Sequence, residues 1–364
     1  MFVKNVLYIG WIGYKNLGDE LMYDLFKEQF ATLGDSFKLD CVNIEHKYLK
    51  NVRIDDFDLI VLGGGSILNG KNNIVHPYII EYLHQCLLLN KKIMMWGTGI
   101  DWLPKSYIQQ LENNEKIPLD STDFWKSKVQ KVFHESVWAG VRGPLTFKIL
   151  GQYGVTDKLH ISGDSAFLLN HQVPQKILPE IQGKKTIGVN WGTSFNNIYG
   201  QDELKVEDQL ANALNQLIEK DYTIYLYTVW QSDYEAMDRL YSKLNKTENV
   251  ILDKTLYSHN ELLGILKNFT FTINFKLHPN YLSLAANVPF IALGYRFKVF
   301  DFIKSIDLEK YIIATDDVDI DEQILRLEQD ISVNSSTLKN KMNDVRETYY
   351  ARIIEPFKNN LFLE

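Results

Sequence analysis

The stretch that decides the fold class is residues 6–33, VLYIGWIGYKNLGDELMYDLFKEQFATL. It opens with the apolar run Val6–Gly10, turns through glycines at positions 10, 13 and 18, and continues with helical spacing of apolar residues over Glu20–Leu33. A strand, a glycine-containing turn and an amphipathic helix form the opening unit of a parallel α/β sheet. The glycine spacing is not GxGxxG, so the turn lacks the dinucleotide-binding fingerprint.

The same alternation of apolar runs and amphipathic stretches continues along most of the 364 residues. The first series of predicted strands is Val6–Gly10, Lys38–Ile44, Asp58–Leu62, Lys92–Trp96, Val137–Val141 and Leu159–Ser162. The second series is Thr186–Asn190, Thr223–Thr228, Val250–Leu252, Phe269–Asn274 and Phe290–Leu293. We therefore expect two α/β domains, residues 1–172 and 186–330, joined by a linker at Val173–Lys185.

The composition changes after residue 306. Asp307–Asp330 carries nine acidic and two basic residues, which predicts a solvated helical face. Ser336–Phe357 is expected to form a helix that ends at Pro356, within a C-terminal segment 331–364. By analogy with other twin-domain α/β enzymes, this helix is expected to cross back to the N-terminal domain.

Charge and cysteine content exclude several classes of protein. The chain has 39 basic and 46 acidic residues, a net charge of −7, which argues against a nucleic-acid binder but allows a local basic site for a small anion. Two cysteines, Cys41 and Cys86, exclude a disulfide scaffold and indicate a cytoplasmic protein. No apolar run is long enough to span a bilayer, while peripheral membrane contact stays open. Zinc, P-loop and serine-hydrolase motifs are absent from the sequence, so we expect no metal and no cofactor.

Ligands of parallel α/β sheets bind at the carboxyl ends of the strands, so the loops that follow the strands are expected to carry the functional residues. Asn16 and Asp19, in the first turn, are candidates for binding hydroxyl groups, with Asp19 as a base. The alternative, a favourable placement of acids at a positive helix end, is the stronger reading of these residues alone. Two further strands end in glycine-rich loops, Gly63-Gly64-Gly65-Ser66 and Trp96–Ile100. Such loops are typical of backbone that approaches a ligand or packs tightly against a neighbouring segment.

Arg142-Gly143-Pro144 predicts a helix that begins at Pro144, because proline is favoured at the first helical position. Arg142 would then lie at a strand end beside free backbone N–H groups, an arrangement suited to a carboxylate or phosphate. A structural salt bridge is an equally good reading.

The second half of the chain places Lys276 and His278 at one strand end, and Arg296 and Lys298 at the next. Pro279 predicts a helix start, and a helix N-terminus lowers the pKa of an imidazole such as that of His278. Four potentially cationic groups on adjacent loops would repel one another unless something anionic neutralises them. This constellation indicates a phosphorylated or doubly anionic ligand.

These segments, in this order, resemble the polysaccharide pyruvyl transferase family. The resemblance extends over about residues 6–305 and rests on the first turn and on six further motifs: GGGSIL (63–68), GTGI (97–100), VRGPLT (141–146), GDSAFLL (163–169), KLH (276–278) and GYRFKVF (294–300). The chain departs from the family at Lys276, where arginine is common, and after Arg142, where an acidic residue is frequent.

The resemblance implies a fold with two Rossmann-like domains facing a central cleft, like that of GT-B glycosyltransferases. It implies phosphoenolpyruvate as the donor and a sugar, in a cell-surface polysaccharide such as a capsule or exopolysaccharide or in its lipid-linked precursor, as the acceptor. The pyruvyl group would form a cyclic ketal on two hydroxyls at the cytoplasmic membrane face. Arg142, His278 and Lys298 match positions implicated in donor binding and catalysis.

On this basis we expect His278 to be the general acid, with Arg142 and Asp19 as further catalytic residues. Donor binding is expected from Arg142, Lys276, His278, Arg296 and Lys298. Acceptor binding is expected in the N-terminal domain, from Asn16, Asp19, Gly64, Gly65 and Ser66.

Two other functions remain open at this point. One is a GT-B glycosyltransferase that uses a nucleotide sugar, because the same basic loops suit a diphosphate. The other is a non-catalytic sugar-binding subunit of a polysaccharide assembly complex. This hypothesis is suggested by Lys276, which stands where the family commonly has arginine. The acceptor sugar, the hydroxyl pair and the oligomeric state are not indicated by the sequence.

Overall fold

The computed structural model describes residues 4–34, 37–69, 73–119, 122–245 and 247–358. The chain folds into two compact units, each built on a six-stranded sheet. Unit 1 comprises residues 1–15, 19–168 and 348–364, and unit 2 comprises residues 16–18 and 169–347.

The sheet of unit 1 has the strand order β2-β1-β3-β4-β5-β6, and all neighbouring strands are parallel. The strands are β1 (Lys4–Gly10), β2 (Phe37–Asn43), β3 (Leu59–Leu62), β4 (Lys92–Thr98), β5 (Trp138–Val141) and β6 (Leu159–Ile161). Because β2 lies on one side of β1 and β3 on the other, the chain changes direction across the sheet between β1 and β3. Loops that leave a parallel sheet at such a point diverge, and a crevice can form between them.

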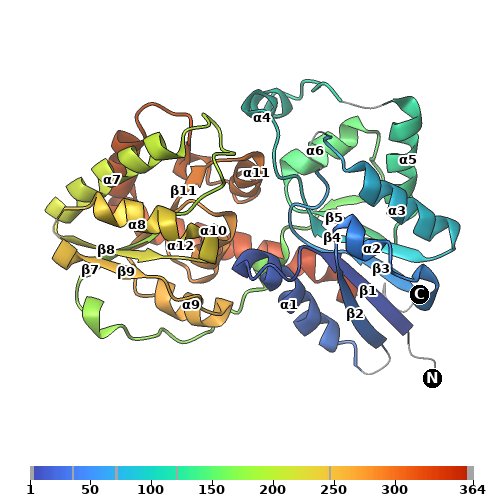
Figure 1. The fold of residues 1–364 in the computed structure, drawn as a ribbon, viewed down its shortest axis with the longest axis horizontal. Helices are drawn as coiled ribbons and strands as arrows, with labels where there is room; N and C mark the ends of the chain where they lie inside the picture. Colours follow the sequence, from blue (N-terminus) through green and yellow to red (C-terminus); the bar gives the residue numbers. More distant parts are fainter. Residues whose placement is uncertain (1–3, 35–36, 70–72, 120–121, 246, 359–364) are drawn as a thin grey trace. The chain divides into compact units, whose positions relative to one another are not determined.

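Helices cover both faces of this sheet (Figure 1). They are α1 (Leu17–Ala31), α2 (His46–Leu49), α3 (Pro77–Leu88), α4 (Lys105–Glu112), α5 (Asp123–His134), α6 (Pro144–Gln152) and α13 (Glu355–Lys358), with the 3₁₀ turns η1 (Ile54–Asp56) and η2 (Ser165–Leu168). On one face, Tyr8 and Trp96 from the strands pack with Phe26 of α1 and Phe357 of α13 in a buried aromatic cluster. Phe357 and its neighbours Ile353 and Ile354 thus complete the core of the first unit.

The sheet of unit 2 has the order β12-β11-β10-β7-β8-β9, again parallel throughout. Its strands are β7 (Lys185–Asn190), β8 (Tyr222–Tyr227), β9 (Val250–Asp253), β10 (Phe271–Asn274), β11 (Phe290–Gly294) and β12 (Ile312–Ala314). This is the doubly wound order in which the direction changes between β7 and β10. The strands β7, β8, β10 and β11 are almost wholly buried, as expected for a sheet covered on both faces.

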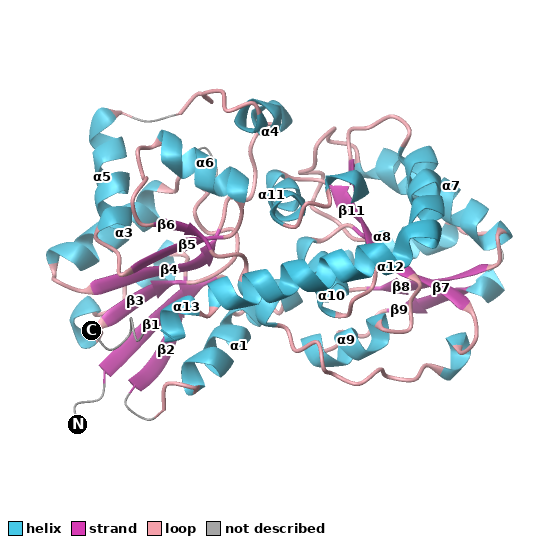
Figure 2. Cartoon of the chain, turned by 180° about the vertical axis from the view of Figure 1, so that it is seen from behind, coloured by secondary structure: helices cyan, strands magenta, loops and turns pink. Residues whose placement is uncertain are grey.

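The helices of unit 2 are α7 (Glu203–Glu219), α8 (Tyr234–Ser242), α9 (His259–Leu266), α10 (Leu277–Ala285), α11 (Phe297–Ser305) and α12 (Ile320–Ile353), with the 3₁₀ turns η3 (Pro179–Ile181), η4 (Gln231–Asp233), η5 (Thr247–Asn249) and η6 (Glu309–Tyr311). The long helix α12 begins in unit 2, and its residues from Thr348 onward belong to unit 1 (Figure 2). In unit 2 the side chain of Gln209, on α7, accepts a hydrogen bond of 2.7 Å from the backbone N–H of Ile320. None of the helices formed by the described residues is both long enough and apolar enough to cross a bilayer.

The predicted fold class, two Rossmann-like α/β sheets with a C-terminal helix that returns to the first domain, is confirmed. The prediction of a helical face over residues 307–330 is wrong in its first half, because η6 and the edge strand β12 lie there and α12 begins only at Ile320. The helix predicted to end at Pro356 ends at Ile353, and Pro356 lies in the separate short helix α13.

The segment predicted as a linker, residues 173–185, packs on unit 2. Lys176 donates a backbone hydrogen bond of 2.9 Å to the carbonyl of Gly264, and Lys267 donates from its ammonium to the carbonyl of Val173. The contact boundary between the units lies at residues 168 and 169, a few residues before the predicted boundary at 172.

Candidate active site

The turn between β1 and α1 is held by its own side chains. The carboxylate of Glu20 accepts hydrogen bonds from the backbone N–H groups of Gly13 (2.8 Å) and Lys15 (3.1 Å). Asn16, directly before α1, accepts a hydrogen bond of 3.1 Å from the N–H of Gly18 through its side-chain oxygen. Both interactions satisfy backbone N–H donors near the start of α1, so Glu20 and Asn16 stabilise the turn and the helix end. Asp19 is half-buried in the first turn of α1, and acceptor binding by Asn16 and Asp19 stays a prediction.

The glycine-rich loop after β3 lies close to β1 and β4. A methyl group on residue 63 would lie 2.1 Å from Cζ of Tyr8, so only glycine fits at that position. Gly64 and Gly65 are buried, and Gly65 has φ of 94°, a conformation that favours glycine. The hydroxyl of Ser66 accepts a hydrogen bond of 3.3 Å from Nη1 of Arg142. Tight packing therefore accounts for Gly63 and backbone conformation for Gly65, and contact of this loop with an acceptor stays a prediction.

Arg142, after β5, is wholly buried. Besides its bond to Ser66, it donates from Nη2 to the carbonyl of Ile100 at 2.8 Å. A methyl group on residue 99 would lie 2.7 Å from Nε of Arg142, so the glycine there leaves room for the guanidinium. As predicted, α6 begins at Pro144 directly after this arginine.

A buried carboxylate faces Arg142. Oδ2 of Asp164 lies 3.9 Å from Nη1 of Arg142, and both side chains have no exposed surface. Oδ1 accepts a hydrogen bond of 2.9 Å from the N–H of Ala166. Burial raises the pKa of Asp164 to about 6, although the charge of Arg142 and the bond from Ala166 act in the opposite direction. Sequence reasoning missed Asp164, whose only signal is its place in the GDSAFLL motif.

Lys276 lies at the point in unit 2 where the sheet changes direction, between the ends of β7 and β10. Its ammonium donates to the carbonyl of Thr193 and lies 3.1 Å from Oδ1 of Asp233. The ammonium also lies 5.2 Å from the ring centre of Trp230, at cation–π distance. The anion that faces Lys276 in this structure is therefore supplied by the chain itself.

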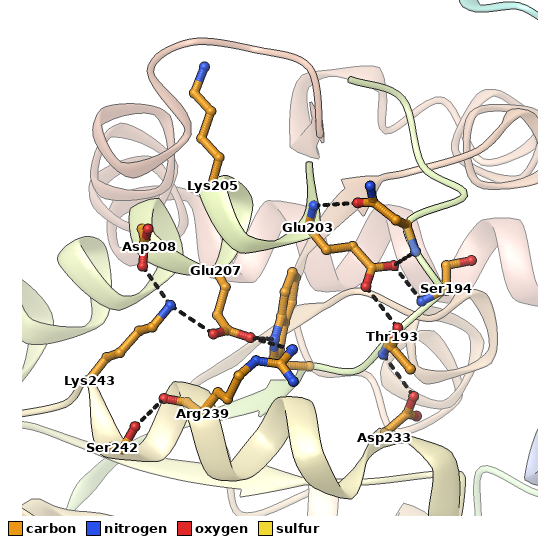
Figure 3. Close-up of polar contacts among 12 residues, drawn as sticks. Thr193, Ser194, Glu203, Lys205, Glu207, Asp208, Asp233, Arg239, Ser242 and Lys243 are labelled. Atoms are coloured by element: carbon orange, nitrogen blue, oxygen red, sulfur yellow. Dashed lines mark hydrogen bonds and ion pairs between the residues drawn. The ribbon is translucent and has the colours of Figure 1, made fainter. Parts of the chain in front are cut away.

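Three buried carboxylates, Glu203, Glu207 and Asp233, organise the loop after β7 (Figure 3). Glu203 accepts hydrogen bonds from the N–H groups of Ser194 (2.6 Å) and Asn196 (3.0 Å) and from the hydroxyl of Thr193 (2.8 Å). Asp233 accepts from the N–H of Thr193 at 3.0 Å, and burial raises its pKa while Lys276 lowers it.

The third of these carboxylates, Glu207, accepts a hydrogen bond of 2.9 Å from the indole of Trp191. It also forms ion pairs with Arg239 (3.2 Å) and Lys243 (2.8 Å). Residues 191–196, which follow β7, are thus fixed by carboxylates from α7 and η4.

His278 is the second residue of α10, whose N-cap is Lys276. The helix begins at Leu277, so the predicted start at Pro279 is two residues late. Within unit 2, Gly18 lies against the imidazole, because a methyl group on residue 18 would come within 1.9 Å of Nδ1 of His278. The structure thus places one residue of the first turn beside the predicted acid.

Arg296 and Lys298 lie at the start of α11, which follows β11. Arg296 is the N-cap residue and donates from Nε to the carbonyl of Asn197 (2.8 Å) and from Nη2 to the hydroxyl of Ser194 (2.5 Å). Nζ of Lys298 lies 5.4 Å from the ring centre of Tyr295. Since β10 and β11 are neighbours in the sheet, the starts of α10 and α11 lie at the same edge.

The predicted site residues therefore form two sets. Arg142 and Ser66 meet in unit 1, whereas the four basic positions Lys276, His278, Arg296 and Lys298 lie at one sheet edge in unit 2. That the two sets serve one site in a central cleft stays a prediction.

Solved structures share this fold at low sequence identity. S. aureus MnaA, in a structure with UDP, matches with a TM-score of 0.65 and 11% identity, over 100% of this chain and 98% of that chain. A putative UDP-N-acetylglucosamine 2-epimerase from Listeria monocytogenes matches with a TM-score of 0.59 and 11% identity, over 99% and 98%. An α,α-trehalose 6-phosphate synthase from Burkholderia multivorans matches with 0.58 and 9%, over 100% and 98%. These likenesses show the fold, a GT-B-like pair of sheets found in epimerases and glycosyltransferases.

The curated proteins include no sequence that matches the chain significantly. The family comparison is more specific than the fold comparison, since residues 16–296 match one family. The matched stretch includes the glycine-rich loops, Arg142, the KLH motif and Arg296. The chain therefore belongs to the polysaccharide pyruvyl transferase family.

Proposed function

We propose that this protein transfers the pyruvyl group of phosphoenolpyruvate to two hydroxyls of a sugar and releases phosphate. The sugar belongs to a cell-surface polysaccharide or to its lipid-linked precursor, handled at the inner face of the cytoplasmic membrane. The methylene carbon of the donor gains a proton, and C2 forms two C–O bonds as its bond to phosphate breaks. Of the two hydroxyl protons lost, one balances the new methyl group and one leaves with hydrogen phosphate.

The observation that carries this proposal is the clustering of basic groups at two neighbouring helix starts. His278 lies in the first turn of α10, and Arg296 and Lys298 lie at the start of α11. Positive charge and helix N-termini together favour a ligand with both a carboxylate and a phosphate. Phosphoenolpyruvate is such a ligand, and membership of the family supports it.

In this proposal His278 protonates the methylene carbon of the donor. Protonation makes C2 cationic in character, so a sugar hydroxyl can attack it. Arg296 and Lys298 hold the carboxylate and phosphate and stabilise the departing phosphate. Donor binding by Lys276 and Arg142 remains predicted, although the ammonium of Lys276 and the guanidinium of Arg142 both have partners within the chain.

The experiment is incubation with phosphoenolpyruvate and a panel of glycosides, some of them lipid-linked, with phosphate release and product mass as readouts. We expect stoichiometric phosphate and a ketal product. Loss of the general acid in His278→Asn should reduce the rate by about 10²–10⁴-fold. His259→Asn is the matched control, because His259 is also at a helix start in unit 2 but lies outside the basic cluster. Full activity of His278→Asn would refute its role, and no phosphate release with any glycoside would refute the function.

Thermal unfolding separates this function from the nucleotide-sugar alternative. A ligand that binds the folded state at free concentration L stabilises it by RT ln(1 + L/Kd), so the melting temperature rises with the logarithm of the ligand concentration once that concentration exceeds Kd. We expect stabilisation by phosphoenolpyruvate and none by UDP or GDP. The reverse result would favour a glycosyltransferase.

A further inference from the structure

Unit 1 contains a pocket that does not include the predicted site residues. It has a volume of about 490 Å³, within the range of small-molecule sites. Trp11 follows β1, Glu45 and His46 follow β2, and Asn69 lies beyond the loop after β3. The pocket therefore opens at the carboxyl ends of the strands where the sheet of unit 1 changes direction, the usual place for a ligand in a parallel sheet.

The side chains of the pocket suit a neutral ligand with many hydroxyl groups. Among the described residues, those that line it include no lysine or arginine, and the ammonium of the neighbouring Lys47 is already paired with Glu45 at 2.6 Å. Burial lowers the pKa of His76, which keeps its imidazole uncharged at neutral pH. Hydrogen bonds from Lys47 and Tyr14 lower the pKa of Glu45, so that side chain remains a carboxylate whose charge is compensated by Lys47.

Aromatic rings form part of the wall. Trp11 and Tyr78 both line the pocket, and the rings of His46 and Tyr78 lie edge to face with centres 4.5 Å apart. An indole or phenol ring offers an apolar face with a polar edge, which matches the apolar C–H face and hydroxyl rim of a pyranose. The carboxylate of Glu45 has lone pairs beyond those used by Tyr14 and Lys47, so it can accept a further hydrogen bond from a sugar hydroxyl.

The wall is also held in place before any ligand binds. The hydroxyl of Tyr14 donates to Oε1 of Glu45 at 2.5 Å. The side-chain amide of Asn69 donates to the carbonyl of Asn73 at 2.8 Å, and its oxygen accepts from the N–H of Trp102 at 3.0 Å. Because these side chains are already fixed, less conformational entropy is lost when a ligand binds.

We propose that this pocket binds an uncharged pyranose ring of the acceptor. The inference rests on the proposed function only in calling the sugar the acceptor; the pocket itself is argued from its lining. It assigns acceptor recognition to Trp11, Glu45 and Tyr78, none of which is among the five acceptor-binding residues predicted in the sequence analysis.

The test uses methyl glycosides of glucose, galactose and mannose, with binding followed by saturation-transfer NMR and titration calorimetry. We expect at least one glycoside to bind the wild-type protein, and Trp11→Ala and Tyr78→Ala to weaken that binding at least tenfold. Phe124→Ala is the matched control, since Phe124 is an exposed aromatic residue of α5 that does not line the pocket. Inorganic phosphate should not compete with the glycoside. A melting curve for each variant shows whether it is folded. If Tyr78→Ala does not fold, Tyr78→Phe, which removes only the hydroxyl, is measured in its place.

Failure of this inference can be told from failure of the proposed function. If no glycoside binds, or if both pocket variants bind as the wild type does, the inference is overturned. If phosphate release from phosphoenolpyruvate depends on a glycoside whose KM is unchanged in Trp11→Ala, the inference again fails while the function stands. If binding depends on Trp11 but no glycoside releases phosphate, the pocket stands and the proposed function fails.

Discussion

Arg142 and Asp164 form a pair that is wholly excluded from solvent, with Nη1 and Oδ2 3.9 Å apart. The separation is longer than a hydrogen bond, so the pair attracts by charge alone. Burial outweighs this attraction at Asp164 and raises the pKa of its carboxyl to about 6. Such a displaced pKa makes the stability of unit 1 depend on pH.

The sign of that dependence follows from linkage. The pKa of Asp164 is about 6 in the folded state, against an ordinary value of 3.8, so the folded state binds the proton more tightly. Its stabilising contribution is complete below pH 4 and is lost as the pH rises through 6, a change of roughly 3 kcal/mol. Asp164→Asn should remove this component, so from pH 4 to 7 its free energy of unfolding should fall less than that of the wild type. Urea denaturation at several pH values measures the difference, and parallel curves would contradict the displaced pKa.

Lys276 and Asp233 provide a second test. Lys276→Met leaves the buried carboxylate of Asp233 without its cation and should lower the free energy of unfolding by about 3–5 kcal/mol. The double variant Lys276→Met/Asp233→Asn should recover at least half of that loss. Lys205→Met is the control, because Lys205 on α7 points away from the carboxylates (Figure 3) and is exposed. Equal effects of Lys276→Met and Lys205→Met in urea denaturation would show that the ion pair does not stabilise the fold.

The Glu203 carboxylate should be necessary for the loop after β7. Glu203→Ala leaves the N–H groups of Ser194 and Asn196 without their acceptor, and we expect a loss of about 3 kcal/mol. Glu219, exposed at the other end of α7, is the matched control, and Glu219→Ala should change stability by less than about 0.5 kcal/mol. Hydrogen exchange should speed up at residues 194 and 196 in Glu203→Ala alone. Unchanged exchange there would mean that the loop holds its shape without the carboxylate.

The aromatic cluster in unit 1 makes the end of the chain a part of the core. Phe357 packs against Phe26 and Trp96, with ring centres 5.7 Å apart in both cases. Phe357→Ala should therefore lower the free energy of unfolding by about 3–5 kcal/mol. Tyr350→Ala, which truncates a half-exposed ring on α12, should cost less than about 1 kcal/mol. Similar losses in chemical denaturation would show that the last residues do not contribute to the core.

Most of the fold could be predicted from local pattern, and the exceptions have physical causes. Eleven predicted strands correspond to β1–β11 because apolar runs of buried strands are evident in sequence. The edge strand β12 was missed since it has only three residues, Ile312–Ala314, and is bordered by acidic residues that suggest a surface helix. Its pairing with β11 is a tertiary interaction, which a local pattern does not carry.

The candidate site was less predictable than the fold. Strand-end loops and helix starts identified Arg142, His278 and Arg296, because those signals are local. The carboxylates that face the basic residues come from distant positions, Asp164 for Arg142 and Asp233 for Lys276. Repulsion among the basic loops suggested a bound anion, yet one of the four cations, Lys276, is neutralised by Asp233 of the same chain. Only the folded arrangement reveals such partners.

The return of α12 to unit 1 has a consequence for the order in which the protein is made. Unit 2 has all of its residues once residue 347 has left the ribosome, whereas unit 1 still lacks Ile353, Ile354 and Phe357. The unit that is translated first is thus finished last, and the apolar patch that Ile353, Ile354 and Phe357 cover on its core stays exposed during synthesis of the whole second unit. A ribosome stalled before residue 348 would display that apolar patch, a feature that chaperones bind.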